Sequence, residues 1–209
     1  MESIITPYSA GEAEFTEKRS RFIGHVWPAA AEEEALAFLE ETRRRYGDSS
    51  HNVFAYHPLR GGERFSDDGE PQGTGGMPVL NVFRQSGVTG FCCVVTRYFG
   101  GVLLGAGGLV RAYSRGASMA LGAAGLARMM QLLELSVRCT YPQFERLRAA
   151  LAGFGAFSAG AEYGADVLMK ISVPSENAQA LAGAVTELTA GEAQIAELGT
   201  TYRPVKLEA

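Results

Sequence analysis

The feature that most constrains the fold is a repeated change of hydrophobic period in the second part of the chain, residues 128–209. Period-two stretches predict strands, and stretches with apolar residues three or four apart predict helices. With right-handed crossovers, the resulting order βαββαβ builds one antiparallel sheet backed by two helices, a ferredoxin-like sandwich. The stretches are a strand over 133–139, a helix over 142–154, strands over 157–163 and 167–173, a helix from about 174 to 190, and a strand over 193–198.

The first part of the chain has a different composition, which predicts a second domain. Of the 26 glycines, 16 lie between Gly61 and Gly125. We therefore expect an α+β protein with domains at residues 1–127 and 128–209. The elements predicted in the first domain are one bent strand or two short strands over 14–27, an amphipathic helix over 30–46, a strand over 52–56, a helix over 78–85, a buried strand over 91–96 and a long helix from about Leu109.

Composition and charge exclude several classes of protein. No apolar run reaches the length of about 18 residues that a membrane span needs, and no basic segment followed by an apolar block indicates a signal peptide, so we expect a cytoplasmic protein without membrane contact. The three cysteines lack metal-ligand spacing. With 23 acidic and 19 basic residues, the net charge of −4 gives no DNA-specific signal, and any contact with nucleic acid must come from local patches.

An acidic loop is the first candidate for chemistry. Asp67, Asp68 and Glu70 place three carboxylates within four residues. Such a group can bind a hard cation, act as a general base or pair with arginines. The same residues with neighbouring glycines are also typical of a capped turn that leads into a helix.

Arg97 is the second candidate, because it follows the uncharged strand residues Phe91 to Val95. A guanidinium at the end of a buried strand needs an acidic or anionic partner, and Asp67 or Asp68 is expected to supply it. Arg97 is then either half of an internal ion pair or an anion clamp, and we expect it to face an open hollow. His51 lies just before another predicted strand, and the chain lacks the sequence motif of a hydrolytic triad. We therefore interpret His51 as a strand-end histidine rather than as a catalytic base.

A glycine-rich segment is the third candidate. Backbone amides that lead into the long helix could form a nest for phosphate at the helix N-terminus, with Arg111 and Arg115 extending it. The segment lacks the P-loop ending and the spacing of a dinucleotide site, and no lysine lies in or beside it in the sequence. The alternative is that the glycines only let the helix pack closely on the sheet. They are Gly100, Gly101, Gly105, Gly107 and Gly108.

Taken together, these motifs resemble the IMPACT family in its bacterial YigZ-type form. The resemblance rests on residues 18–23, 50–56, 67–76, and 95–101 continuing to 107–113. It implies a first domain with the fold shared by a domain of a small-subunit ribosomal protein and domain IV of elongation factor G, and a second domain like domain V of that factor. Eukaryotic relatives regulate translation by competing for the activator of a stress kinase, whereas bacterial members have no firmly assigned reaction.

Residues and resemblance together predict a cytoplasmic binding or regulatory protein of translation that contacts RNA or a ribosome-associated protein and needs no cofactor. The alternative is an enzyme of phosphoryl transfer or hydrolysis in which the acidic loop holds Mg²⁺, and a third possibility is a protein-interaction module with no anion ligand. The candidate anion or RNA ligands are Arg19, Arg21, His51, Arg97, Gly100, Gly101, Gly105, Gly107, Gly108 and Arg111, with Asp67, Asp68 and Glu70 as their acidic partners or as metal ligands.

Overall fold

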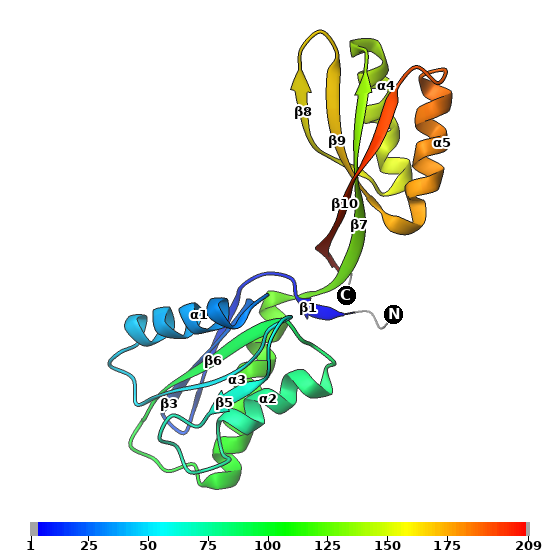
Figure 1. Cartoon of the computed structure of the whole chain (residues 1–209). Coiled ribbons are helices and arrows are strands. Elements are labelled where there is room, and N and C mark those ends of the chain that lie inside the picture. Colours follow the sequence, from blue (N-terminus) through cyan, green and yellow to red (C-terminus); the bar gives the residue numbers. More distant parts are fainter. Residues whose placement is uncertain (1–3, 208–209) are drawn as a thin grey trace. The chain divides into compact units, whose positions relative to one another are not determined.

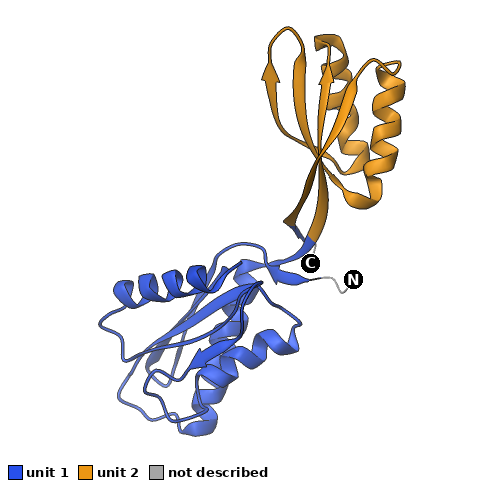
Figure 2. Cartoon of the chain, in the orientation of Figure 1, with its two compact units in different colours: residues 1–129, 204–209 blue, residues 130–203 orange. Residues whose placement is uncertain are grey.

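The computed structural model describes residues 4–207, which form two compact units (Figure 2). Unit 1 comprises the chain up to Met129 together with the segment from Pro204, and unit 2 comprises Met130–Arg203. The segment from Pro204 thus joins unit 1, although the sequence pattern assigned it to the second domain. No helix within the described residues is long and apolar enough to cross a membrane.

Unit 1 is built on a five-stranded sheet with three helices (Figure 1). The strand order is β2-β3-β6-β4-β5, and all neighbouring strands are antiparallel. Helix α1 packs on one face, and helices α2 and α3 pack on the other. The elements are β2 (Gly11–Glu17), β3 (Ser20–Pro28), α1 (Glu32–Arg45), β4 (His51–His57), β5 (Arg64–Ser66), α2 (Gly76–Gln85), β6 (Phe91–Tyr98) and α3 (Ala106–Ala124).

The central strand β6 is covered on both faces, which explains the uninterrupted apolar run in its sequence. Phe91, Cys93 and Val95 enter the core against α2 and α3, whereas Cys92 and Val94 enter the core against α1. Alternate side chains point to opposite faces of a strand, so a strand covered on both faces has to be apolar throughout. Arg97 continues the series of odd-numbered residues and therefore lies on the face of α2 and α3.

Strands β2 and β3 form a hairpin, which resolves the ambiguity over residues 14–27 in favour of two strands. Glu17 pairs with Ser20 across the two residues Lys18 and Arg19, whose φ angles are +45° and +68°. Positive φ at both central residues is the conformation of a tight type I′ turn, which usually uses asparagine or glycine. A basic dipeptide therefore gave no recognisable turn signal.

Unit 2 has the strand order β10-β7-β9-β8, with two helices packed on its sheet (Figure 1). Strand β7 begins in unit 1, where its first residues pair with β1. Strand β10 continues beyond the predicted 193–198. The prediction missed its later residues because most of them are exposed and show no hydrophobic alternation. The remaining elements are β1 (Ile5–Pro7) of unit 1, followed by β7 (Leu126–Cys139), α4 (Tyr141–Ala150), β8 (Phe157–Tyr163), β9 (Val167–Pro174), α5 (Ala178–Leu188) and β10 (Gln194–Lys206), with 3₁₀ turns at Leu151–Phe154 and Ser175–Asn177.

Candidate functional site

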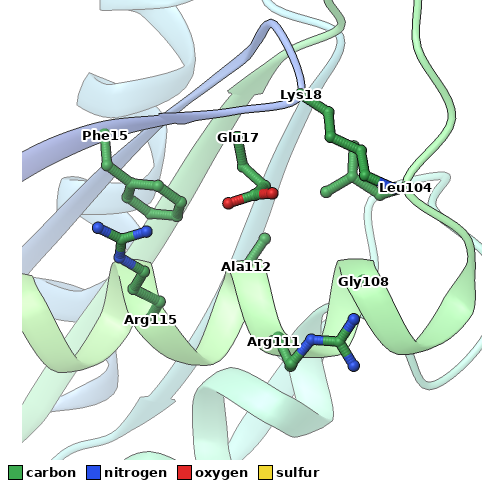
Figure 3. A pocket seen from close by; sticks show the side chains of 8 residues that line it. All are labelled: Phe15, Glu17, Lys18, Leu104, Gly108, Arg111, Ala112 and Arg115. Atoms are coloured by element: carbon green, nitrogen blue, oxygen red, sulfur yellow. The ribbon is translucent and has the colours of Figure 1, made fainter.

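Two pockets of unit 1 lie along the N-terminal half of α3 and share Leu104 as a wall. The first, which we call the Lys18 pocket, has a volume of about 260 Å³ (Figure 3). It lies between the β2–β3 hairpin and α3. Its lining residues are Phe15, Glu17, Lys18, Leu104, Gly108, Arg111, Ala112 and Arg115.

The Lys18 pocket carries an excess of positive charge. Lys18, Arg111 and Arg115 form no salt bridge with any residue within 4–207, and Glu17 is the one acidic side chain among the lining residues. The Arg115 guanidinium lies over the Phe15 ring, 4.4 Å from its centroid (Figure 3). Three cations against one carboxylate favour an anionic ligand.

The start of α3 adds to this positive field. Gly105 is the N-cap with φ +74°, no side chain caps the helix, and its first turn contains no acidic residue. The first amides of a helix have no partner within the helix, and the helix dipole places partial positive charge there. Gly107 and Gly108 belong to this first turn, and the Arg111 guanidinium lies beside Gly108 in Figure 3.

Gly100 explains how Lys18 reaches α3. A Cβ atom on Gly100 would lie 2.0 Å from the backbone oxygen of Arg19, so only glycine lets the loop after β6 pass this close to the hairpin turn. The Gly100 amide also donates a hydrogen bond to Ser20 Oγ at 3.2 Å. The fold therefore brings a lysine to the glycine segment, although none lies beside it in sequence. Gly101, in the same loop, has a φ angle of +79°.

The second pocket, which we call the Glu70 pocket, has a volume of about 510 Å³. Its floor is polar, and its walls are mostly apolar. The lining residues are Ser50, His51, Glu70, Pro71, Arg97, Phe99, Leu103, Leu104, Gly105, Ala106 and Leu109.

Arg97 at this floor is part of a buried ion pair. Its Nη1 donates to Glu70 Oε1 at 2.6 Å, and the two side chains are 5% and 4% exposed. Its partner is therefore Glu70, and the expectation of Asp67 or Asp68 was wrong. The guanidinium also lies over the rings of Phe22 and Phe99, at 5.5 and 5.4 Å. Arg97 thus lines a pocket while being neutralised within the protein.

Glu70 also accepts a second strong hydrogen bond. The Tyr113 hydroxyl donates to the same Oε1 at 2.6 Å, and burial together with this carboxylate raises the pKa of Tyr113 well above its usual value. His51 Nε2 lies 3.9 Å from Oε1. Because the Asp68 carbonyl oxygen can only accept, His51 Nδ1 carries the proton and donates to it at 2.8 Å. Oε2 of Glu70 has no hydrogen-bond partner among the described residues.

The two aspartates have structural roles. Asp67 accepts hydrogen bonds from the amides of Gly73, Gly75 and Gly76, at 2.8, 2.9 and 2.9 Å, and so holds the turn into α2. Burial opposes ionisation of Asp67, but these three amides outweigh it and lower its pKa. Asp68 Oδ2 accepts a hydrogen bond from the backbone amide of Asn52 at 2.6 Å. Over residues 4–207, no three carboxylate, histidine or cysteine side chains are grouped as metal ligands, so the Mg²⁺ cluster of the enzyme alternative is not assembled.

The remaining predicted residues lie outside both pockets. Arg21 forms a salt bridge with Glu14 at 2.6 Å on the sheet face that carries α1, whereas Arg97 lies on the other face of the sheet. Arg19 is exposed in the hairpin turn, where its backbone packs on Gly100. The sequence reasoning missed Lys18, Phe99 and Tyr113. The basic run that begins at Lys18 was the only signal for the first, and its partner surface lies about 90 residues away.

These observations define an α+β protein of two units, with a cation-lined pocket beside a buried carboxylate–guanidinium pair in the first. The model of the Impact N-terminal domain matches residues 18–121, and that of a domain of unknown function (DUF1949) matches residues 137–192. IMPACT family member YvyE of Bacillus subtilis is 32% identical over 97% of this chain and 94% of its own length. IMPACT family member YigZ of Escherichia coli is 33% identical over 93% of this chain and 98% of its own length.

A solved structure shows the same relationship. It is described as a "hypothetical protein", is 34% identical to this chain, and aligns with a TM-score of 0.60 over 93% of this chain and 97% of its own. The chain therefore belongs to the IMPACT family.

Proposed function

We propose that this protein is a regulator of translation that binds RNA through the phosphates that the Lys18 pocket accepts. The observation that carries the proposal is the group of three cations, Lys18, Arg111 and Arg115, without salt-bridge partners among the described residues. Guanidinium groups donate to phosphate oxygens in a fork geometry, and the uncapped start of α3 attracts the same anion. The role in translation rests on family membership and is part of the proposal.

The net charge of −4 makes the local character of this site important. A protein with overall negative charge is not drawn to RNA from a distance, so affinity has to come from contacts at short range. Seven arginines outside this pocket form salt bridges with acidic side chains, namely Arg21, Arg43, Arg45, Arg64, Arg84, Arg97 and Arg148. The Lys18 pocket differs from these positions because its three cations have no salt-bridge partners among the described residues.

The expected fold classes belong to the same proposal. The order β10-β7-β9-β8, with α4 and α5 on the sheet of unit 2, supports the ferredoxin-like arrangement. For unit 1 we retain the likeness to the ribosomal-protein domain and to domain IV of elongation factor G, both of which occur in proteins of the translation machinery.

The test is fluorescence anisotropy of a labelled 12-nucleotide single-stranded RNA, titrated at several KCl concentrations. Each phosphate contact contributes about −0.7 to the slope of log K against log salt for a single strand, so Arg111→Ala with Arg115→Ala should lower the magnitude of the slope by about 1.4. The matched control is Arg44→Ala with Arg146→Ala, two exposed arginines outside the pocket. The proposal is refuted if wild-type binding is independent of salt or if both double variants show the same slope, and a ribosome-associated protein then becomes the favoured partner.

A further inference from the structure

The Glu70 pocket has the composition of a ligand site, and no step of phosphate binding uses it. Its volume of about 510 Å³ lies within the range of small-molecule pockets. Leucines 103, 104 and 109 together with Phe99 form the apolar walls, and Glu70, His51 and Arg97 form the polar floor. A ligand that fits has one flat apolar part and one polar edge.

The polar floor offers a hydrogen-bond acceptor. Glu70 Oε1 already accepts from Arg97 and Tyr113, whereas Oε2 has no partner among the described residues although the side chain is only 4% exposed. Oε2 is not one of the fully buried atoms that lack a partner, so it keeps contact with solvent and can accept a hydrogen bond from an N–H group that a ligand brings into the pocket. The guanidinium of Arg97 is held in place by Glu70 and leaves that oxygen for the ligand.

The rim of the pocket is unusually apolar for a surface. Phe99 is 48% exposed and Leu103 is 82% exposed, and both line the Glu70 pocket. The Arg97 guanidinium lies near the Phe99 ring, which holds this ring beside the opening. An exposed aromatic ring next to a cationic groove is the usual platform on which proteins stack the bases of single-stranded nucleic acid.

The position of the pocket links it to the phosphate site. Leu104 lines both pockets, and the first turns of α3 pass from Gly105 and Ala106 in the Glu70 pocket to Gly108 and Arg111 in the Lys18 pocket. A base and its phosphate are likewise joined by a short ribose linker. We propose that the Glu70 pocket takes one unstacked RNA base that bears an exocyclic amino group, while the adjacent backbone phosphate lies in the Lys18 pocket. This inference rests on the proposed function.

The amino group follows from the chemistry of Glu70. A carboxylate accepts from the N4 amino group of cytosine, as in direct readout of bases, whereas the N3–H of uracil lies between two carbonyl oxygens that repel a carboxylate. The pocket should therefore prefer cytosine to uracil. Stacking on Phe99 is common to every base and sets the affinity that both share.

The experiment compares three 12-nucleotide RNA probes in the anisotropy assay: oligocytidine, oligouridine and a ribose-phosphate strand without bases. Wild type should bind oligocytidine about tenfold more tightly than the abasic strand, since stacking of one base contributes about that factor, with oligouridine between them. Phe99→Ala should lower the affinity for oligocytidine toward that for the abasic strand and leave abasic binding unchanged. The matched control is Phe65→Ala, at a phenylalanine that is 43% exposed and lies outside both pockets.

The outcomes separate this inference from the proposed function. Equal affinity of wild type for oligocytidine and the abasic strand, with the salt slope still lowered in the Arg111 and Arg115 variant, overturns the base site alone and assigns the apolar rim to a protein partner. Equal affinity for oligocytidine and oligouridine overturns the role given to Glu70. Absence of salt-dependent binding to all three probes overturns both proposals.

Discussion

The buried ion pair between Glu70 and Arg97 gives the sharpest test of how unit 1 is held together. The substitution Glu70→Gln keeps the shape of the side chain and an acceptor oxygen but removes the negative charge. Arg97 then remains buried as a cation, with Ser20 Oγ at 3.4 Å as its other hydrogen-bond partner and its Nε without any. Removing one member of a buried pair costs about 3–5 kcal/mol of unfolding free energy.

The measurement is urea unfolding followed by tryptophan fluorescence. Trp27 is the only tryptophan of the chain and lies in β3, so the signal reports on unit 1. With a urea dependence of about 2 kcal/mol per molar, the expected loss lowers the midpoint by about 1.5–2.5 M. The control is Glu14→Gln, the same substitution at an exposed pair, which should leave the midpoint nearly unchanged.

A double-mutant cycle completes the test. Arg97→Met in the Glu70→Gln background removes the uncompensated cation and should recover part of the lost stability. A midpoint for Glu70→Gln within about 0.5 M of wild type would refute the reasoning, because a shift that small corresponds to about 1 kcal/mol, which is typical of exposed pairs.

Three further predictions use the same fluorescence assay or simple labelling. Gly24→Ala should destabilise unit 1 strongly, because its Cβ would lie 2.3 Å from a backbone carbonyl oxygen of α3, whereas Gly122→Ala in α3, with open space around it, should stabilise by up to about 1 kcal/mol; similar midpoints for both would contradict the packing. Burial, with a smaller opposing effect of Glu12, lowers the pKa of His25. From about pH 6.5 downward the unfolded chain therefore binds a proton that the folded chain does not, and the free energy of unfolding should fall by at most about 1.4 kcal/mol per pH unit. An unchanged pH slope in His25→Gln would count against this explanation. All three cysteines are buried and burial raises their pKa values, that of Cys92 to about 12, so a thiol reagent should label none of them before unfolding and three after it.

Sequence reasoning predicted those elements in which a single hydrophobic period decides the structure. The helix at Glu32–Arg45 was predicted because its buried residues recur at helical spacing, and the strand at Phe91–Tyr98 because burial on both faces requires an unbroken apolar run. The start of β3 was ambiguous because the turn uses Lys18 and Arg19 in place of glycine or asparagine. Turn chemistry of that kind is imposed by the surrounding sheet.

The candidate site was only partly predictable for a related reason. The sequence indicated that Arg97 needs an acidic partner, but three carboxylates within four residues are equivalent until the loop folds. The loop turns Asp67 toward the amides before α2 and Glu70 toward Arg97. Lys18 and Arg111 come together only because Gly100 admits the hairpin turn, a contact between distant segments that no local pattern encodes.

The assignment of the segment from Pro204 to unit 1 has a consequence for biosynthesis. Unit 2 is, in sequence, an insertion between Met129 and Pro204, so the first unit is interrupted by 74 residues. The Leu207 amide donates to the Leu126 carbonyl oxygen at 2.9 Å, a bond that a nascent chain emerging N-terminus first can make only after the whole insertion has been synthesised. Vectorial folding therefore lets the sheet, the helices and both pockets of unit 1, which lie within residues 11–124, form before the insertion is synthesised, whereas the strand segment from Pro204 joins them last.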